Sequence, residues 1–256
     1  MTRILLLGFF CFSICALGEM SLDFQSWSAK DKKAEHKITY TFGTKRHRID
    51  TSGADGVSIL LEPAARKIYL LNHSGKTVME MDEVQLKKMA ETAAKALTVI
   101  KKQLGGNLSS LPPAARKQLQ EMEKLTAKPA KYTYKKLASN VAVSKWKTTQ
   151  YLVLANKHPV SKVWTQDWKD APLKRSQLQP IFDMTDRIVS MPGPGAMRLP
   201  RLSAELGLPI KTEEMDNKGR VTGGSVLTDV HDRKVAQNFF EVPAGYKKTA
   251  MPMMPK

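Results

Sequence analysis

Residues 36–42 read His-Lys-Ile-Thr-Tyr-Thr-Phe, and this stretch decides how the chain is interpreted. Apolar and polar residues alternate along it, so Ile38, Tyr40 and Phe42 share one face, as in a β-strand with one buried side. Gly43-Thr44 then turns the chain, and residues 45–50 continue as a basic strand. The stretch therefore predicts the start of an antiparallel sheet.

The same pattern continues outward from residue 50. Val57–Leu61 and Lys67–Leu71 read as paired strands, and Asn72-His73-Ser74-Gly75 turns the chain into a further strand at Thr77–Met81. Together with the opening stretch, these segments predict a meander of about five strands.

The period then changes from that of a strand to that of a helix. Asp82 and Gln85 form a capping box, and apolar residues recur at helical spacing from Glu83 to Leu104. Pro112-Pro113 opens a second helical stretch that ends before Lys128-Pro129. The sequence thus predicts a helical insertion at about residues 82–127.

Strands return after residue 130. His158-Pro159 is expected to interrupt a hairpin, and Gly223-Gly224-Ser225 reads as a bulge or a close backbone approach inside a strand. The later predicted elements are strands at Trp146–Ala155, Ser161–Trp168, Leu208–Met215 and Val221–Val230, and a helix at Gln177–Val189. The predicted fold class is α+β, a single curved antiparallel β-sheet (half-barrel-like) with helices inserted mid-chain, and residues 19–250 form one domain.

The two ends of the chain differ from the rest. Arg3, the apolar run from Ile4 to Ala16 and the small residues of Ala16-Leu17-Gly18 predict a cleavable signal peptide at residues 1–18. The mature chain then begins at Glu19, has no transmembrane span and is expected to be periplasmic or secreted. The Met- and Pro-rich tail, residues 251–256, is expected to be disordered.

Composition narrows the classes of function. Cys11 and Cys15 both lie in the predicted signal peptide, so thiol catalysis, thiolate zinc sites and disulfides are excluded from the mature protein. The whole chain has 41 Lys and Arg against 24 Asp and Glu, a formal net charge of +17. Outside the cytoplasm such a charge favours acidic envelope surfaces as partners over nucleic acid.

No motif for catalysis or metal binding stands out. The five histidines, His36, His47, His73, His158 and His231, show no metal-ligand spacing. Gly223-Gly224-Ser225 lacks the spacing of a nucleophile elbow. We therefore predict no catalytic residue, no metal site and no cofactor, and a protein that is not an enzyme.

Inward-facing strand positions are the candidates for a ligand-binding surface. They are Ile38, Tyr40, Ile59, Leu61, Tyr151 and Trp164. A filled core would use the same positions, so both interpretations stay open.

The order of these features resembles that of a known family. The pair at residues 58–61 and 67–71, the tyrosine strand at 149–153, the tryptophan strand at 163–165 and the closing Phe240–Lys247 resemble the exported bacterial domain-of-unknown-function family 4412. Members of that family often carry a cysteine before the tyrosine strand, which this chain lacks, and this chain is unusually basic. The family is similar in strand order to the periplasmic lipoprotein-carrier half-barrel, which implies a curved sheet that holds an apolar ligand under a helical lid.

Three functions remain open at this point. The first is a non-enzymatic binding module for a lipid or other apolar ligand. The alternative is a basic envelope protein that binds acidic polymers or a protein partner, with a filled core. The third is an enzyme whose site the sequence does not reveal. An apolar pocket on the concave face would favour the first.

Overall fold

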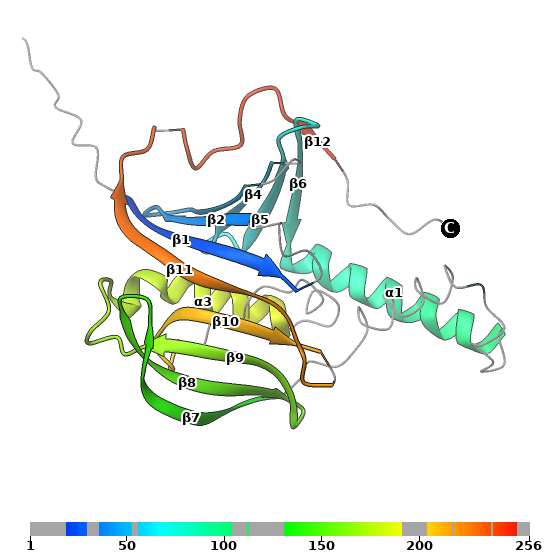
Figure 1. Cartoon of the computed structure of the whole chain (residues 1–256). Helices are drawn as coiled ribbons and strands as arrows, with labels where there is room; N and C mark the ends of the chain where they lie inside the picture. The colour runs from blue at the N-terminus through cyan, green and yellow to red at the C-terminus, as the bar shows by residue number, and fades with distance from the viewer. Residues whose placement is uncertain are drawn as a thin grey trace, which may run out of the picture.

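The strands of the protein form one curved sheet that stays open at its edges (Figure 1). The computed structural model describes residues 19–29, 36–52, 56–103, 112, 131–190, 204–216, 218–236 and 238–249. The twelve strands follow the order β12-β6-β5-β4-β3-β2-β1-β11-β10-β9-β8-β7. Neighbours are antiparallel, except that β12 pairs in parallel with β6. The predicted curved, mainly antiparallel sheet is confirmed, with a small helix content.

The first half of the sheet is a meander with one additional strand. The predicted strands between residues 36 and 82 are all present, and β1 comes before them, with Leu22 and Phe24 buried. The elements are β1 (Glu19–Ser28), β2 (His36–Phe42), β3 (His47–Thr51), β4 (Val57–Glu62), β5 (Lys67–Asn72) and β6 (Thr77–Asp82). β1 lies between β2 and β11, so it joins the beginning of the sheet to its end.

Helix α1 (Glu83–Gln103) follows β6 directly and extends away from the sheet (Figure 1). Its predicted capping box is present: the Gln85 amide donates to Asp82 Oδ1 over 2.7 Å, and the Asp82 amide donates to Gln85 Oε1 over 3.1 Å. The second predicted helix, the signal peptide and the tail at 251–256 lie outside the described residues. No helix in the described part of the chain is long and apolar enough to cross a membrane.

Helix α3 belongs to the second half of the chain and lies behind β10 and β11, where it packs on the concave face of the sheet (Figure 1). Helix α3 begins at Arg175, two residues before the predicted Gln177, so Pro180 lies inside the helix and has no backbone N–H to donate to the Ser176 carbonyl. The elements are β7 (Tyr132–Val143), β8 (Trp146–Ala155), β9 (His158–Gln166), α3 (Arg175–Ser190), β10 (Leu208–Met215), β11 (Val221–Arg233) and β12 (Lys247–Lys248).

In the hairpin at β8 and β9 the predicted first strand, Trp146–Ala155, is confirmed, but the predicted boundaries of the second strand are wrong. The turn consists of Asn156 and Lys157, both with positive φ, so His158 and Pro159 already belong to β9. Pro159 is tolerated because it lies near the strand end, where the register shifts by one residue. Trp168 lies beyond β9, and its indole Nε1–H donates to the Ala204 carbonyl over 2.7 Å.

The glycine pair in β11 is a close backbone approach, as predicted. A Cβ atom at Gly224 would lie 2.3 Å from the Thr212 carbonyl oxygen and 2.4 Å from the Trp27 ring. Both distances are shorter than van der Waals contact, so no larger residue fits at this position without displacing β10 or β1.

The sheet buries apolar residues on both of its faces. The larger cluster lies on the concave face, where Leu22, Phe42 and Leu208 pack with Leu178 and Phe182 of α3. The smaller cluster, Leu60, Leu71 and Val78, lies on the opposite face under Val242 and Tyr246. The C-terminal segment, residues 238–249, therefore covers the convex face of β4–β6.

Candidate functional site

A pocket lies between the concave face of the sheet and helix α3. The sheet contributes residues of β1, β2, β10 and β11, and α3 contributes Leu178, Ile181 and Phe182 from its first half. The lining residues are Leu22, Phe24, Ile38, Tyr40, Phe42, Leu178, Ile181, Phe182, Leu208, Pro209, Lys211, Thr212 and Ser225. Most of them are apolar, which is typical of a site for an apolar group.

The strand period explains how the floor of the pocket forms. In the antiparallel register, Leu22 is opposite Tyr40 and Phe24 is opposite Ile38, so these side chains share one face. The rings of Phe24 and Tyr40 meet edge to face, with centroids 5.5 Å apart. Residues that alternate along two adjacent strands therefore form a continuous apolar surface.

The pocket carries little charge and has a small volume. Burial raises the pKa of Tyr40 to about 12, so its hydroxyl stays protonated at neutral pH. The enclosed volume is about 40 Å³, which holds only a few water-sized groups. As the structure stands, the pocket fits the end of an apolar chain but not a whole lipid.

The predicted ligand-binding residues divide into three groups. Ile38 and Tyr40 line the pocket. Ile59 and Leu61 belong to the same concave core but lie outside the lining. Tyr151 and Trp164 lie on β8 and β9; Trp164 is buried with its ring 4.6 Å from the Lys211 ammonium. A ligand-binding role for any of the six remains a prediction.

A buried histidine lies next to the pocket floor. His47 is directly opposite Phe42, is only 5% exposed, and its ring centroid lies 5.9 Å from that of Phe42. Burial lowers the pKa of His47 from 6.5 to about 4, because the charged imidazolium would lose its hydration. Its Nδ1 atom is buried without a hydrogen bond from any described residue.

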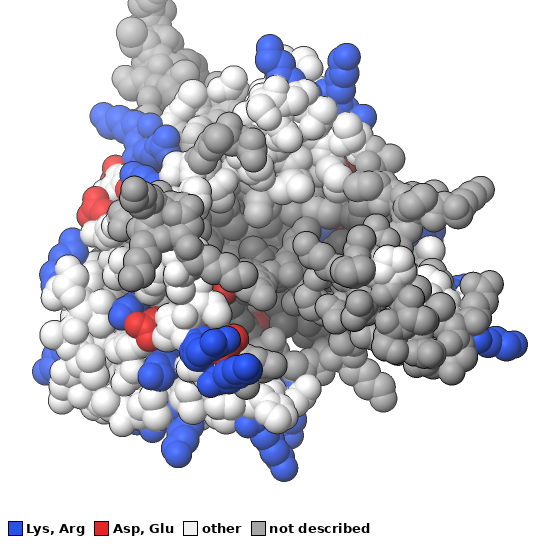
Figure 2. All heavy atoms as spheres, turned by 45° about the vertical axis from the view of Figure 1, so that its right-hand side comes forward, with Lys and Arg blue, Asp and Glu red and all other residues white. Residues whose placement is uncertain are grey.

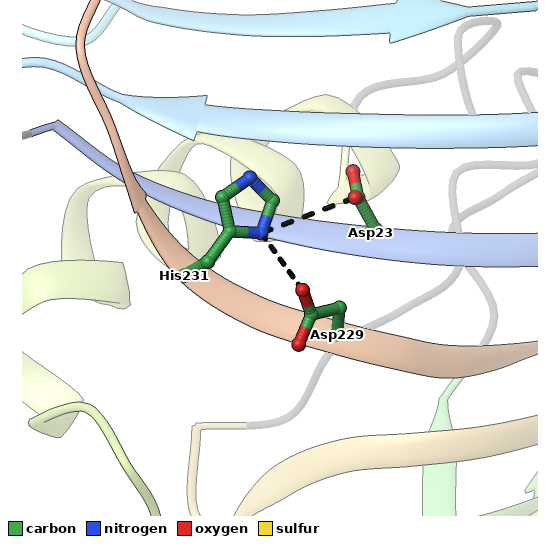
Figure 3. A group of neighbouring side chains, drawn as sticks. All are labelled: Asp23, Asp229 and His231. Atoms are coloured by element: carbon green, nitrogen blue, oxygen red, sulfur yellow. Dashed lines mark ion pairs between the residues drawn. The ribbon is translucent and has the colours of Figure 1, made fainter.

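Asp23, Asp229 and His231 come together on the face of the sheet turned away from α3, and we call them the His231 cluster (Figure 3). His231 Nδ1 lies 3.2 Å from Asp229 Oδ2 and 4.0 Å from Asp23 Oδ2. The sequence did not predict this cluster, because Asp23 on β1 and His231 on β11 become neighbours only when the two strands pair.

Lysines already neutralise both carboxylates of the His231 cluster. Lys37 Nζ lies 2.8 Å from Asp23 Oδ2, and Lys145 Nζ lies 3.8 Å from Asp229 Oδ1. Burial would raise the pKa of Asp23, but hydrogen bonds from Lys37 and Thr39 outweigh it and lower the pKa. A metal ion would have to displace Lys37, so the arrangement works as an ion-pair network that fixes β1 against β2 and β11.

A second polar network connects the convex face to the C-terminal segment. The Asp50 carboxylate accepts hydrogen bonds from Arg48 Nε over 2.7 Å and from the Ser58 hydroxyl over 2.5 Å. His73 Nε2 lies 2.6 Å from Ser58 Oγ, and His73 Nδ1 lies 2.5 Å from the Tyr246 hydroxyl. We call this set, from Arg48 to Tyr246, the His73 chain.

The direction of the hydrogen bonds in the His73 chain does not suit a nucleophilic serine. A nucleophilic serine gives its proton to histidine. Here the Ser58 proton is directed at Asp50, because a carboxylate only accepts, and the His73 Nε2–H then donates to Ser58. Burial and the nearby Arg48 lower the pKa of His73, which keeps it neutral. The network therefore anchors Tyr246 to the sheet.

Solved structures align with most of this chain, whereas family models and curated proteins do not match it. An uncharacterized conserved protein from Thermus thermophilus is 5% identical with a TM-score of 0.47, over 91% of each chain.

Two further solved structures are similar over most of this chain. The MucA/MucB complex of Pseudomonas aeruginosa is 10% identical with a TM-score of 0.39, over 90% of this chain and 56% of that one. A LolA superfamily protein from Nitrosomonas europaea is 9% identical with a TM-score of 0.27, over 87% and 89%. At these values no ligand or partner is carried over from those proteins to this chain.

Proposed function

We propose that this protein is an exported, non-enzymatic binding protein that holds an apolar group in the pocket between the sheet and α3. The observation that carries the proposal is the apolar lining shared by β1, β2 and α3. A fully packed core would leave no such space, since protein interiors contain few voids larger than a water molecule.

The size of the pocket indicates how a ligand would enter. The enclosed volume of about 40 Å³ accommodates a chain end of a few methylene groups. A longer acyl chain requires α3 to move away from the sheet, which separates Phe182 from Trp168, whose ring centroids are 6.0 Å apart. Helix α3 is thus proposed to act as a lid over a lipid or another apolar ligand.

Export is part of the same proposal and depends on the predicted signal peptide at residues 1–18, which would leave Glu19 as the first residue of the mature chain. N-terminal sequencing of the protein from its native envelope is expected to begin at Glu19, and an intact Met1 there would contradict the proposal.

Membership of family 4412 is part of the same proposal. The residues of the resemblance fall on described elements: 58–61 on β4, 67–71 on β5, 149–153 on β8 and 163–165 on β9. The closing Phe240–Lys247 lies in the C-terminal segment, where the Phe240 carbonyl accepts a hydrogen bond from Arg46. Four of these pieces therefore lie in the sheet, and the fifth lies in the segment that covers its convex face.

The test of ligand binding is native mass spectrometry of the mature protein purified from its own envelope, followed by lipid extraction. We expect a stoichiometric apolar molecule to co-purify, or to be taken up when lipids are added. A protein that remains without ligand under both conditions is incompatible with the proposal.

A pair of matched variants locates the bound molecule. Ile38→Trp fills the pocket from a half-buried lining position, whereas Ile59→Trp adds the same bulk at a half-buried position of the same core outside the lining. We expect only Ile38→Trp to lose the ligand. Equal loss in both variants would place the ligand elsewhere.

A further inference from the structure

The strands at one end of the sheet contain lysines but no carboxylates. Residues 131–166, which we call the lysine wing, comprise β7, β8 and β9 with their turns. Their basic residues are Lys131, Lys135, Lys136, Lys145, Lys147, Lys157 and Lys162, and the segment contains no Asp or Glu. Figure 2 shows blue side chains projecting around the lower rim of the molecule, where Figure 1 places these strands.

Most of these seven lysines have no carboxylate partner among the described residues. Among the described residues, Lys145 alone of the seven forms an ion pair, with Asp229 at 3.8 Å. Glu213 on β10 is directly opposite Lys162 in the register, but Lys211 holds it over 2.7 Å. The other six ammonium groups have no carboxylate partner among the described residues, and all of them except Lys162 belong to exposed residues.

The charge extends over both sides of the wing. Cross-strand pairing puts Lys135, Leu152 and Lys162 on one face and Lys136 with Tyr151 on the other. β7 ends the order of the sheet, and Leu137 on it is 43% exposed. The wing is thus a projecting edge with cations on both sides and an apolar residue between them.

Protection of an edge strand explains only part of this pattern. Lysines on an edge strand discourage pairing with other chains, which accounts for Lys135 and Lys136 on β7. It does not account for Lys147 on β8 and Lys162 on β9, which are not edge strands, or for the absence of acidic residues from all three. A surface that only needed solubility would mix both signs of charge.

We propose that the lysine wing is a docking surface for an anionic lipid bilayer. Lysines near an anionic membrane surface each strengthen binding, by about five-fold. The wing is an edge of the sheet with cations on both sides, and such an edge can meet a planar anionic surface. Leu137 and the tyrosines of β7 and β8 suit the interface between head groups and acyl chains. The proposal does not depend on occupancy of the pocket.

Vesicle co-sedimentation of the mature chain tests this proposal. We expect binding to vesicles of phosphatidylglycerol mixed with phosphatidylcholine, no binding to phosphatidylcholine alone, and a decrease with added salt. Lys135→Gln, Lys136→Gln and Lys147→Gln together remove three exposed cations and should weaken binding by about 100-fold. The three matching Lys→Arg changes keep the charge and should preserve binding.

A matched control separates this surface from the net charge of the protein. Lys45, Lys76 and Lys174 are exposed in turns and loops outside the wing, and changing all three to Gln alters the net charge equally. Equal weakening by both triple variants would overturn the proposal, and so would binding to a sulfated polysaccharide without binding to vesicles. Ile38→Trp should leave vesicle binding unchanged, so the two proposals can fail separately.

Discussion

Residues 36–82 and residues 131–166 each contain seven lysines and arginines, but the two segments use them in opposite ways. In the first segment, which we call the paired wing (β2–β6), five of the seven are held by carboxylates: Lys37, Arg46, Arg48, Arg66 and Lys67. In the lysine wing, one of the seven has an ion pair among the described residues. Positive charge holds the structure together in one wing and is left free in the other.

The two wings also differ in how their surfaces are covered. The C-terminal segment crosses the paired wing, where Arg48 donates to the Phe239 carbonyl over 2.9 Å and stacks on the Phe239 ring at 4.6 Å. Among the described residues, the C-terminal segment makes no hydrogen bond, ion pair or ring contact with the lysine wing. Because of this difference, we expect substitutions of cations to change the stability of the fold in the paired wing and the binding to anionic vesicles in the lysine wing.

The largest effect on stability is expected for Arg48→Met. Arg48 is nearly buried and bonds Asp50, Ser58 and the Phe239 carbonyl, so its removal leaves Asp50 without a countercharge. We expect a loss of about 3–4 kcal/mol in the free energy of unfolding, measured by chemical denaturation. The matched change Lys135→Met in the lysine wing should alter stability by less than about 0.5 kcal/mol. Similar losses in both variants would remove the distinction between the wings.

The next effect concerns the pH dependence of stability. Because burial lowers the pKa of His47 from 6.5 to about 4, the unfolded chain binds a proton that the folded chain does not in this range. Stability should therefore fall as the pH drops from 6.5 to 4, by about 2–3 kcal/mol. His47→Leu should flatten this part of the curve, whereas His158→Gln, at an exposed position of the lysine wing, should not. An unchanged slope in His47→Leu would contradict the assignment.

A third substitution tests the junction between the two wings. Gly224→Ala places a methyl group 2.3 Å from the Thr212 carbonyl oxygen and should cost about 2 kcal/mol through overpacking. Gly219→Ala, in the open hairpin turn at a φ of +76°, should cost about 1 kcal/mol. Thermal denaturation of both variants compares them, and a smaller loss at Gly224 would mean that β10 and β1 yield to the added methyl.

The smallest effect on stability is expected at the contact between His73 and Tyr246 of the C-terminal segment. Tyr246→Phe removes the hydroxyl that His73 Nδ1 meets at 2.5 Å and should cost about 1 kcal/mol. Hydrogen exchange should then rise in residues 238–249 and stay unchanged in the lysine wing. Uniform exchange across both regions would show that the His73 chain does not anchor this segment.

Local patterns predicted much of the structure. The alternation of Ile38, Tyr40 and Phe42 gave the face that lines the pocket, and Asp82 with Gln85 gave the start of α1. Each depends on residues a few positions apart, for which the periods of strand and helix suffice. The start of β9 was predicted too late, because the positive φ of Asn156 and Lys157 cannot be read from their types alone.

Contacts between distant residues decided the rest. The sequence alone suffices for the apolar faces of the strands, the start of α1 and the absence of carboxylates from residues 131–166. The tertiary structure decided that β1 pairs with β11, which brings Asp23 to His231, and that α3 closes the concave face. Tertiary contacts also place the C-terminal segment over the paired wing and not over the lysine wing. Pairing between the ends of a chain depends on which faces are buried together, and this burial is a property of the whole fold that no local period contains.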